Sequence, residues 1–318
     1  MSVEPSQKYL SAFTEVPVID VSGARDPAKR RELATQMVKV AQEVGFMYIV
    51  GHGIDQGLID GVFDMSSRFF SLPDAEKRQI HITKSAARRG YLGLREKGND
   101  PTFKGNNLEA FHCAEEPPTD EAPSPLRGKN QWPAAPENFR DTVYTYYQSG
   151  YRLGLTLLEL LAEGLGEPTD TFTRHYKRSI SYLRLLKYAQ IDDPAVQLLA
   201  RPHLDTGVIT ILAQDPSGGL EVLNKAEEWI PAPPIPGSFI INIGRTLELW
   251  SGGRFTATRH HVVNRGGAPR YSMPIFMTPD YDMVVTPLGE EVKEGTPSFR
   301  VGYEQLATFE RIWPAPTV

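Results

Sequence analysis

The sequence predicts an α+β protein in which helices flank a β-sandwich or barrel. From residue 179 onward, short apolar runs alternate with turns rich in Pro, Gly, Asp and Asn, a spacing typical of a β-core. The 318-residue chain also contains 27 glycines and 26 prolines. Their combined share exceeds the average of about 12% for these two residues, which indicates many turns. The first half instead carries helical periodicities, so helices are expected to pack against the β-core.

The N-terminal region is predicted to alternate strands with helices. Continuous apolar runs indicate strands, whereas apolar side chains spaced three and four residues apart indicate helices with one buried face. By these criteria the order is strand 17–22, helix 27–44, strand 46–50 and helix 56–71. Residues 83–136 hold many charges, glycines and prolines, so we expect loops there with a few short strands. Loops of this length are commonly lids or binding segments.

The C-terminal half is expected to build the β-core on one long helix. Residues 137–166 carry the longest helical pattern, and Gly150 and Gly154 within it permit close packing against a sheet. Short apolar runs then predict the strands Tyr182–Tyr188, Val208–Ala213, Gly219–Leu223, Phe239–Ile243, His261–Val263 and Tyr271–Met277. A last helix is predicted near the C-terminus, over residues 302–312.

Composition and charge exclude several classes of protein. The net charge is -5 and no basic block is present, so nucleic acid is not expected as a partner. No apolar run approaches the roughly 20 residues that span a bilayer, and the N-terminus lacks the pattern of a signal peptide, so no membrane association is expected. The single cysteine, Cys113, fits a reducing compartment. We therefore expect a cytoplasmic protein, and both a monomer and a homodimer remain open.

The residues most able to carry chemistry are a His-x-Asp pair and one distant histidine. His203 and Asp205 are two apart, so on a strand they point to the same face, within reach of one ion. Such a pair alone is more often a surface hydrogen bond than a metal site. A second histidine, His260, follows a Ser-Gly-Gly turn and opens a later strand. Two imidazoles and one carboxylate have the composition of the facial triad of non-haem Fe(II) enzymes.

A cationic fork follows His260 along the chain. Arg270 and Ser272 are also two apart and therefore share a face on a strand. The turn-forming segment 264–269 predicts a hairpin that sets His260 and Arg270 on adjacent strands, about 4.8 Å apart. A guanidinium gives a carboxylate two parallel hydrogen bonds, and a serine hydroxyl adds another. The fork therefore predicts a site for a short dicarboxylate beside the metal.

Together with their flanking motifs, these residues resemble the isopenicillin N synthase-like branch of the Fe(II)/2-oxoglutarate-dependent oxygenases. The resemblance covers nearly the whole chain. Its motifs lie at residues 17–20, 45–54, 89–91, 203–205, 236–244, 251–262 and 270–272. It implies an α+β fold with a distorted double-stranded β-helix core (jelly-roll, cupin-like) flanked by helices.

The resemblance also implies an oxidoreductase. It assigns His203, Asp205 and His260 as ligands of Fe(II), with 2-oxoglutarate and O2 at the remaining positions of the metal. His261 falls where a non-ligand residue is common, and alternation along a strand points it away from the face of His260. Such a dioxygenase converts 2-oxoglutarate to succinate and CO2 while it hydroxylates, desaturates or cyclises a small-molecule substrate.

The resemblance further implies roles for residues around the metal. Arg270 and Ser272 would bind the distal carboxylate of 2-oxoglutarate, and Tyr188 resembles a tyrosine that often assists. The plant enzymes often have Asn where Leu186 stands, and a leucine cannot donate the same hydrogen bond. Candidate contacts of the primary substrate are Arg184, Arg88, Tyr91, Phe111 and Phe276. For Arg184, a ligand contact and a place on the sheet exterior both stay open.

Two other functions are compatible with the same residues. An iron oxidase of the isopenicillin N synthase type would use O2 without 2-oxoglutarate and bind a substrate carboxylate at the fork. A non-catalytic metal-binding protein would hold the ion alone. In the domain organisation that the resemblance implies, residues 1–135 form an N-terminal non-haem dioxygenase region packed on the core. Residues 136–318 form the scaffold helix and the catalytic domain, and the two parts make one compact unit.

Overall fold

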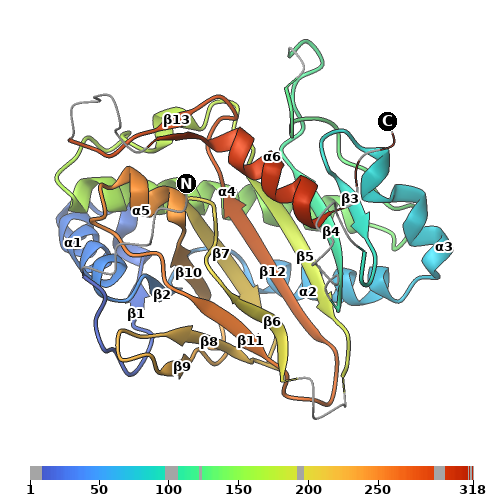
Figure 1. The fold of residues 1–318 in the computed structure, drawn as a ribbon, viewed down its shortest axis with the longest axis horizontal. Coiled ribbons are helices and arrows are strands. Elements are labelled where there is room, and N and C mark those ends of the chain that lie inside the picture. The colour runs from blue at the N-terminus through green and yellow to red at the C-terminus, as the bar shows by residue number, and fades with distance from the viewer. Residues whose placement is uncertain are drawn as a thin grey trace.

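A large mixed sheet forms the centre of the molecule (Figure 1). The computed structural model describes residues 9–96, 107–121, 124–191, 197–289, 298–313, 315 and 317. The strand order of the large sheet is β1-β2-β10-β7-β12-β5-β4-β3. Its strands are β1 (Val18–Asp20), β2 (Phe46–Val50), β3 (Gly90–Leu92), β4 (Leu108–Ala114), β5 (Tyr182–Tyr188), β7 (Ile209–Gln214), β10 (Phe239–Ile243) and β12 (Arg270–Met277).

A smaller sheet faces the large one. Its order is β6-β11-β8-β9, with the strands β6 (Leu198–His203), β8 (Leu220–Leu223), β9 (Trp229–Pro231) and β11 (His260–Val263). Between β5 and β12 the chain passes back and forth between the two sheets, apart from β8 and β9, which pair within the smaller sheet. A third sheet joins β13 (Val284–Val285) to β14 (Phe299–Arg300). Mixed sheets and helices make this an α+β protein, as the sequence predicts.

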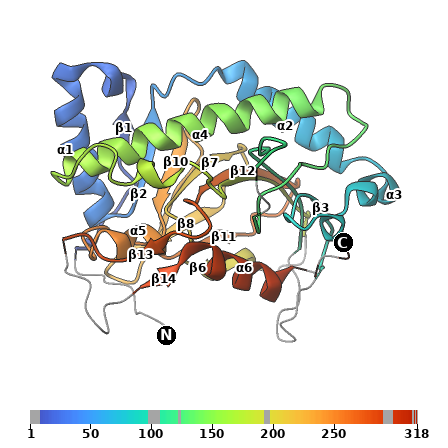
Figure 2. The ribbon, with the colours of Figure 1, turned by 90° about the horizontal axis from the view of Figure 1, so that it is seen from above.

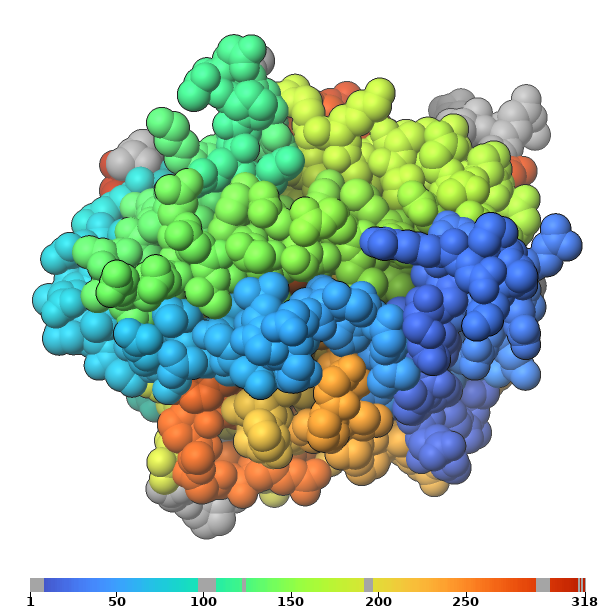
Figure 3. All heavy atoms as spheres, turned by 180° about the vertical axis from the view of Figure 1, so that it is seen from behind, coloured from blue at the N-terminus to red at the C-terminus, as the bar shows by residue number. Residues whose placement is uncertain are grey.

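Helices cover the back of the large sheet. The longest, α4 (Phe139–Gly164), lies across it beside α1 (Pro27–Glu43) and α2 (Gln56–Phe70) (Figures 2 and 3). A Cβ atom on Gly150 or Gly154 would collide with the side chains of Ile275 and Met277 on β12, so these glycines allow the close packing that the sequence predicts. The apolar core therefore sits between this face of the sheet and α4.

Local sequence signals explain where the first helices begin. The carboxylate of Asp26 accepts a hydrogen bond from the backbone N–H of Ala28 at 2.9 Å, and Pro27 occupies the first turn of α1. In the same way, Asp55 accepts from the N–H of Leu58 at 3.0 Å at the start of α2. These caps satisfy donors that a helix leaves unpaired at its N-terminus, so the helix starts follow from the sequence.

Further helices lie at the edges of the molecule. They are α3 (Asp74–Lys77), α5 (Arg245–Trp250) and α6 (Val301–Ile312). Figure 2 shows α6 on the side of the large sheet opposite to α4, so the front of the sheet faces the smaller sheet and α6. Within the described part of the chain, no helix has the length and apolar character needed to cross a membrane.

The strand β6 and the helix α5 were not expected from the sequence. β6 lies at the edge of the smaller sheet and contains Pro202, with its last residues exposed. An edge strand tolerates proline because one side of its backbone has no partner strand, and the apolar part of β6, Leu198–Ala200, is too short a run to stand out in the sequence. Within the predicted loop region 83–136, residues 97–106 and 122–123 lie outside the described part of the chain.

Candidate metal and cosubstrate site

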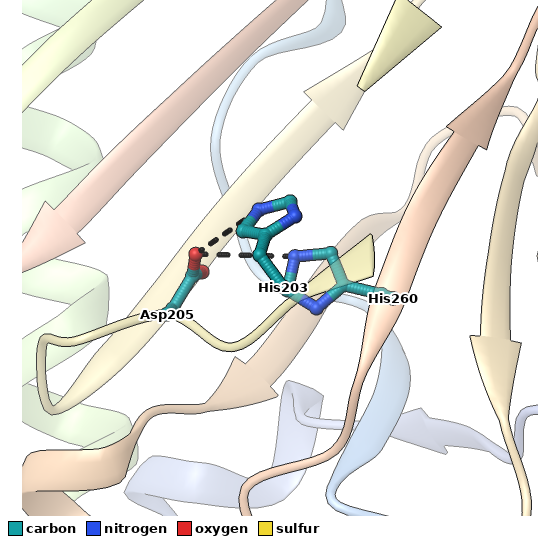
Figure 4. Close-up of side chains that lie close together, drawn as sticks. All are labelled: His203, Asp205 and His260. Carbon is teal, nitrogen blue, oxygen red and sulfur yellow. Dashed lines mark ion pairs between the residues drawn. The ribbon is translucent and has the colours of Figure 1, made fainter. Parts of the chain in front are cut away.

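Two histidines and one aspartate from distant parts of the chain converge in front of the large sheet. Ligand atoms of His203, Asp205 and His260 all lie within 4.8 Å of one another (Figure 4). Nε2 of His203 lies 3.8 Å from Oδ1 of Asp205, and Nε2 of His260 lies 3.9 Å from the same oxygen. One carboxylate oxygen therefore faces both imidazoles.

The route by which Asp205 reaches this point differs from the prediction. His203 is the last residue of β6, and Asp205 lies beyond it in the connection that leads to β7. The two residues therefore do not share a strand face, and strand alternation is the wrong explanation for their proximity. Asp205 instead comes from the connection between β6 and β7, two residues past the end of β6.

Each imidazole is oriented by the backbone. A carbonyl oxygen can only accept, so Nδ1 of His203 donates to the carbonyl of Arg201 at 2.8 Å, and Nδ1 of His260 donates to that of Thr258 at 3.2 Å. In both rings the proton therefore sits on Nδ1. In the neutral form of each ring, the Nε2 atom, which faces Asp205, is therefore left to donate a lone pair to a metal ion.

The carboxylate of Asp205 is held by two neutral donors on the large sheet. The hydroxyl of Thr210 on β7 donates to Oδ2 at 2.5 Å, and the amide of Asn242 on β10 donates to the same oxygen at 2.8 Å. Thr210 and Asn242 are cross-strand partners, and both are buried. Since Oδ2 is occupied, Oδ1 is the oxygen available to an ion.

The protonation states of the triad suit a cation. Burial, followed by the neighbouring His203, lowers the pKa of His260 to about 4, so its imidazole is neutral near pH 7. Burial alone would raise the pKa of Asp205, but its interactions with His260 and His203 and the bonds from Asn242 and Thr210 outweigh burial and lower it. The site thus presents a neutral imidazole at His260 and an ionised carboxylate at Asp205.

His261 points away from the triad, as alternation along β11 predicts. Its Nε2 lies 2.9 Å from a carboxylate oxygen of Glu221, and its ring stacks on Trp229 with centroids 3.7 Å apart. These partners hold the ring on the opposite face of the smaller sheet. His260 is therefore the histidine of the pair that reaches Asp205.

The arginine fork lies on the front face of the large sheet, but not on a strand adjacent to His260. β11 pairs with β6 and β8, whereas β12, which starts at Arg270, pairs with β5 and β7. The predicted hairpin is therefore wrong, because the turn after β11 carries the chain from one sheet to the other. The fork and the triad approach each other across the space between the sheets.

Arg270 is buried and fixed by several contacts. Its Nε donates to the carbonyl of Gly218 at 2.7 Å, and its Nη1 donates to the hydroxyl of Ser272 at 3.1 Å. Tyr188 lies directly opposite on β5, with its ring centroid 5.1 Å from the guanidinium carbon. Gln214 on β7 accepts a longer bond of 3.4 Å from Nη2. These contacts hold a cation at a defined position for an anionic ligand.

A cavity of about 430 Å³ contains both the triad and the fork. This volume is within the range of small-molecule sites. Among the predicted substrate contacts, Arg184 and Phe276 line it, from β5 and β12, together with Tyr188 and Leu186. The helix α6 contributes the outer wall.

The other predicted substrate contacts are not among the described residues that line this cavity. Phe111 and its cross-strand partner Tyr91 point to the back of the sheet, where the ring of Phe111 packs on that of Phe139 with centroids 5.0 Å apart. Arg88 is buried in the segment before β3. Strand alternation separates Phe111 from Leu108, which does line the cavity.

The sequence interpretation missed the residues that support the triad. Asn242 is a polar side chain inside the apolar run Phe239–Ile243, and such a residue in a buried strand needs a partner. That signal could have marked it. Thr210 gave no comparable signal, because threonine is common in strands.

Two regions of the chain match known protein families. Residues 16–135 match the family described as non-haem dioxygenase in morphine synthesis N-terminal. Residues 178–279 match the 2OG-Fe(II) oxygenase superfamily. The second match contains the triad and the fork.

Most of the chain is also similar to individual proteins. It is 32% identical over 277 residues to a 2-oxoglutarate-dependent dioxygenase of Aspergillus niger, covering 84% of this chain and 85% of that protein. It is 34% identical over 279 residues to one of Penicillium crustosum, again covering 84% and 85%. Among solved structures, a full-length Neurospora crassa protein in complex with alpha-KG and thymine matches with a TM-score of 0.80 and 26% identity, covering 96% of this chain and 99% of that one.

Proposed function

The chain belongs to the 2OG-Fe(II) oxygenase superfamily, and from this premise we propose which of its residues serve each part of the reaction. The protein is an Fe(II)- and 2-oxoglutarate-dependent dioxygenase that oxidises a small molecule. When iron and 2-oxoglutarate are bound, they supply the oxidising chemistry, in which O2 is reduced and 2-oxoglutarate becomes succinate and CO2. The chain supplies the binding, orientation and enclosure of the reactants.

His203, Asp205 and His260 hold the iron. The donor set suits Fe(II), which is bound by two imidazoles and one carboxylate on one face in this class of site. Three features of the structure support the fit: the Nδ1 protons are turned to the backbone, Oδ2 of Asp205 is occupied, and Oδ1 faces both Nε2 atoms. The ion therefore meets three unprotonated donor atoms and keeps its other positions open.

Arg270 and Ser272 bind the distal carboxylate of 2-oxoglutarate. The guanidinium is buried in the cavity that contains the triad, and a buried cation needs an anionic partner to offset its desolvation. Tyr188 packs against the guanidinium and fixes its plane. This arrangement positions one end of the dicarboxylate away from the metal and leaves its keto acid end free to reach the metal.

The core that carries the site is a distorted double-stranded β-helix. This proposal is supported by the alternation of strands β5 to β12 between the two sheets. We also propose that residues 1–135 and 136–318 form one compact unit, since β1 to β4 extend both edges of the sheet that contains β5, β7, β10 and β12. A cytoplasmic location stays a prediction from the cysteine content of the sequence.

The single observation that carries the assignment is the convergence of the triad and the fork in one cavity. It is tested by anaerobic addition of Fe(II) and 2-oxoglutarate to the purified protein. A weak visible charge-transfer band is expected, and admission of air should then produce succinate. In Asp205→Ala both signals should disappear while the circular dichroism of the protein is unchanged.

The same experiment separates the other interpretations of the sequence. An iron oxidase that works without a keto acid would consume O2 with iron and substrate but without added 2-oxoglutarate. A non-catalytic metal protein would bind iron and produce no succinate. We expect neither result, and succinate formation that persists in Asp205→Ala would contradict the assigned triad.

A further inference from the structure

Arg184 is a second arginine on the front face of the large sheet, and part of its guanidinium has no hydrogen-bond acceptor among the described residues. Its Nε and Nη2 atoms are sealed from solvent and have no hydrogen-bond acceptor among the described residues. These two N–H groups lie on the same edge of the guanidinium and donate in parallel. Leaving such donors buried and unpaired costs free energy, so the site is incomplete without an acceptor.

The position of Arg184 separates it from the 2-oxoglutarate fork. On β5, Tyr188 lies opposite Arg270 of the fork. At the other end of β5, Tyr182 lies opposite Phe276. Phe276 is also the cross-strand partner of Thr210, which supports Asp205. Arg184 is four residues from Tyr188, about 13 Å along the strand. It therefore lies towards the metal end of the cavity. It is also two strands, or about 10 Å, from β7.

The charges that line the cavity favour an anionic ligand beyond 2-oxoglutarate. Among the described lining residues, the arginines Arg184, Arg201, Arg270 and Arg311 face a single carboxylate, Asp205. The two charges of Fe(II) and the two of 2-oxoglutarate cancel. A positive excess remains after both are bound, and it attracts an anion into the cavity.

Aromatic side chains line the cavity on the side of Arg184. Trp313 beyond α6 lies with its ring 5.4 Å from the guanidinium carbon, and Tyr182 stacks on Phe276 with ring centroids 4.9 Å apart. All of them line the cavity. Arg184 as a whole is only partly buried and lines this cavity, so a ligand that enters can meet its guanidinium, while the rings offer an apolar surface for the rest of that ligand.

We propose that the primary substrate carries a carboxylate on an apolar body, and that Arg184 binds this carboxylate through its Nε and Nη2 edge. The proposal rests on the proposed function, because it assigns the substrate of that same site. The parallel pair of N–H groups matches the two oxygens of a carboxylate. The volume of about 430 Å³ suits a small acid beside 2-oxoglutarate. Arg201 and Arg311 are exposed at the cavity mouth and help to draw the acid in.

The test compares acids with neutral analogues of the same shape. Phenylacetate, 3-phenylpropanoate and decanoate, each with its primary amide, are titrated anaerobically into the protein loaded with Fe(II) and 2-oxoglutarate. The shift of the charge-transfer band reports binding near the metal. At least one acid should bind roughly tenfold or more tighter than its amide. Arg184→Gln should reduce this ratio to about one, and Arg184→Lys should keep part of it.

Controls separate this proposal from charge in general and from the proposed function. Arg68→Gln, on the exposed face of α2, removes one positive charge far from the cavity and should keep the acid preference. Arg311→Gln should weaken binding of the acid a few-fold at low salt. This variant tests whether positive charge at the cavity mouth attracts the acid, even if Arg184 variants fold poorly. The affinity for 2-oxoglutarate should stay within about twofold in Arg184→Gln.

Several results would overturn the proposal. They are equal binding of acids and amides, an acid preference that survives in Arg184→Gln, no response to any acid of the panel, or loss of 2-oxoglutarate binding in Arg184→Gln. Absence of the 2-oxoglutarate band from the wild-type protein has a different meaning. It would contradict the proposed function itself.

Discussion

The amide of Asn242 donates a hydrogen bond of 2.8 Å to Oδ2 of Asp205. Thr210 donates to the same oxygen, so the carboxylate is fixed by two neutral side chains from adjacent strands β7 and β10. A neutral donor orients a carboxylate without cancelling its charge. The large sheet therefore determines which oxygen of Asp205 faces the metal, although Asp205 itself lies in the connection between β6 and β7.

The first prediction concerns these supporting bonds. Asn242→Ala and Thr210→Val should each lower the affinity for Fe(II) by about 10- to 100-fold, the usual effect of losing a partner behind a metal ligand. The loss arises because the carboxylate can rotate away from the two imidazoles. An anaerobic titration with Fe(II), or with Co(II) followed by its visible spectrum, measures the affinity without turnover.

Thr256→Val is the matched control for this prediction. Thr256 is buried like Thr210, but its hydroxyl donates to the backbone carbonyl of Gln42 at 2.8 Å. Its loss should lower stability by about 1 kcal/mol and leave the affinity for Fe(II) unchanged. If Asn242→Ala and Thr210→Val bind Fe(II) as tightly as the wild type and Thr256→Val do, a supporting role for Asn242 and Thr210 is contradicted.

The second prediction distinguishes the two adjacent histidines. In His260→Ala the affinity for Fe(II) should fall by more than the roughly 100-fold that loss of a supporting bond can cost, because a ligand itself is removed. His261→Ala should bind Fe(II) as the wild type does, since His261 contacts Glu221 and Trp229 instead. Metal content after gel filtration measures both. Metal loss in a folded His261→Ala protein would show that the two residues are assigned the wrong way round.

Apolar strands could be predicted from the sequence because burial on both faces leaves a continuous signal. Phe46–Val50, Tyr182–Tyr188 and Phe239–Ile243 have the predicted bounds in the structure. The strand β6 could not be predicted, since its short apolar run, Leu198–Ala200, gives way to the exposed Arg201, Pro202 and His203. The choice of His260 over His261 could also be predicted, because alternation along a strand is a local property.

Relations between strands were harder to predict than the strands themselves. The turn after β11 has the residues of a hairpin turn, and the same residues also serve a connection between two sheets. The pairing of β12 with β5 and β7 depends on the burial of its whole length, which a short motif does not report. For the same reason Phe111 was expected at the cavity, although its strand turns it to the aromatic core at the back.

The third prediction concerns the arginine fork. Arg270→Gln should weaken binding of 2-oxoglutarate on the order of 100-fold, since two charge-assisted hydrogen bonds are lost. Ser272→Ala should weaken it only about two- to tenfold, because one neutral bond is lost. Titration of the anaerobic iron-loaded protein with 2-oxoglutarate, followed by the charge-transfer band, measures both effects.

Iron binding provides the control for the fork. Arg270 contacts Gly218, Ser272 and Tyr188, and none of these is a member of the triad. The affinity for Fe(II) should therefore be unchanged in Arg270→Gln. If 2-oxoglutarate binds to Arg270→Gln as it does to the wild type, another cation holds the distal carboxylate and the assignment of the fork is wrong.

The fourth prediction concerns the stability of the fold at different pH values. Glu248 on α5 is buried, and its carboxyl accepts a hydrogen bond of 3.1 Å from the backbone N–H of Ala257. Burial raises its pKa from the ordinary value of 4.5 to about 7. The folded protein therefore binds the proton more tightly than the unfolded chain does, and folding is favoured when the group is protonated.

The sign of the effect follows from this raised pKa. The stabilisation is fully present below pH 4.5 and is lost as the pH rises through about 7. Glu248→Gln stays neutral at every pH and keeps an oxygen for the bond from Ala257. Relative to the wild type, it should therefore gain stability between pH 5 and pH 8, by up to about 3 kcal/mol.

Urea unfolding of the wild type and of Glu248→Gln, with EDTA present and at several pH values, measures the difference in their free energies of unfolding. The other titrating groups are common to the two chains, so their contributions cancel. Glu137→Gln changes an exposed glutamate and should follow the wild-type curve in parallel. If Glu248→Gln also runs parallel to the wild type from pH 5 to pH 8, Glu248 is ionised in the folded protein throughout this range. The hydrogen bond from Ala257 would then outweigh the cost of burying the charge.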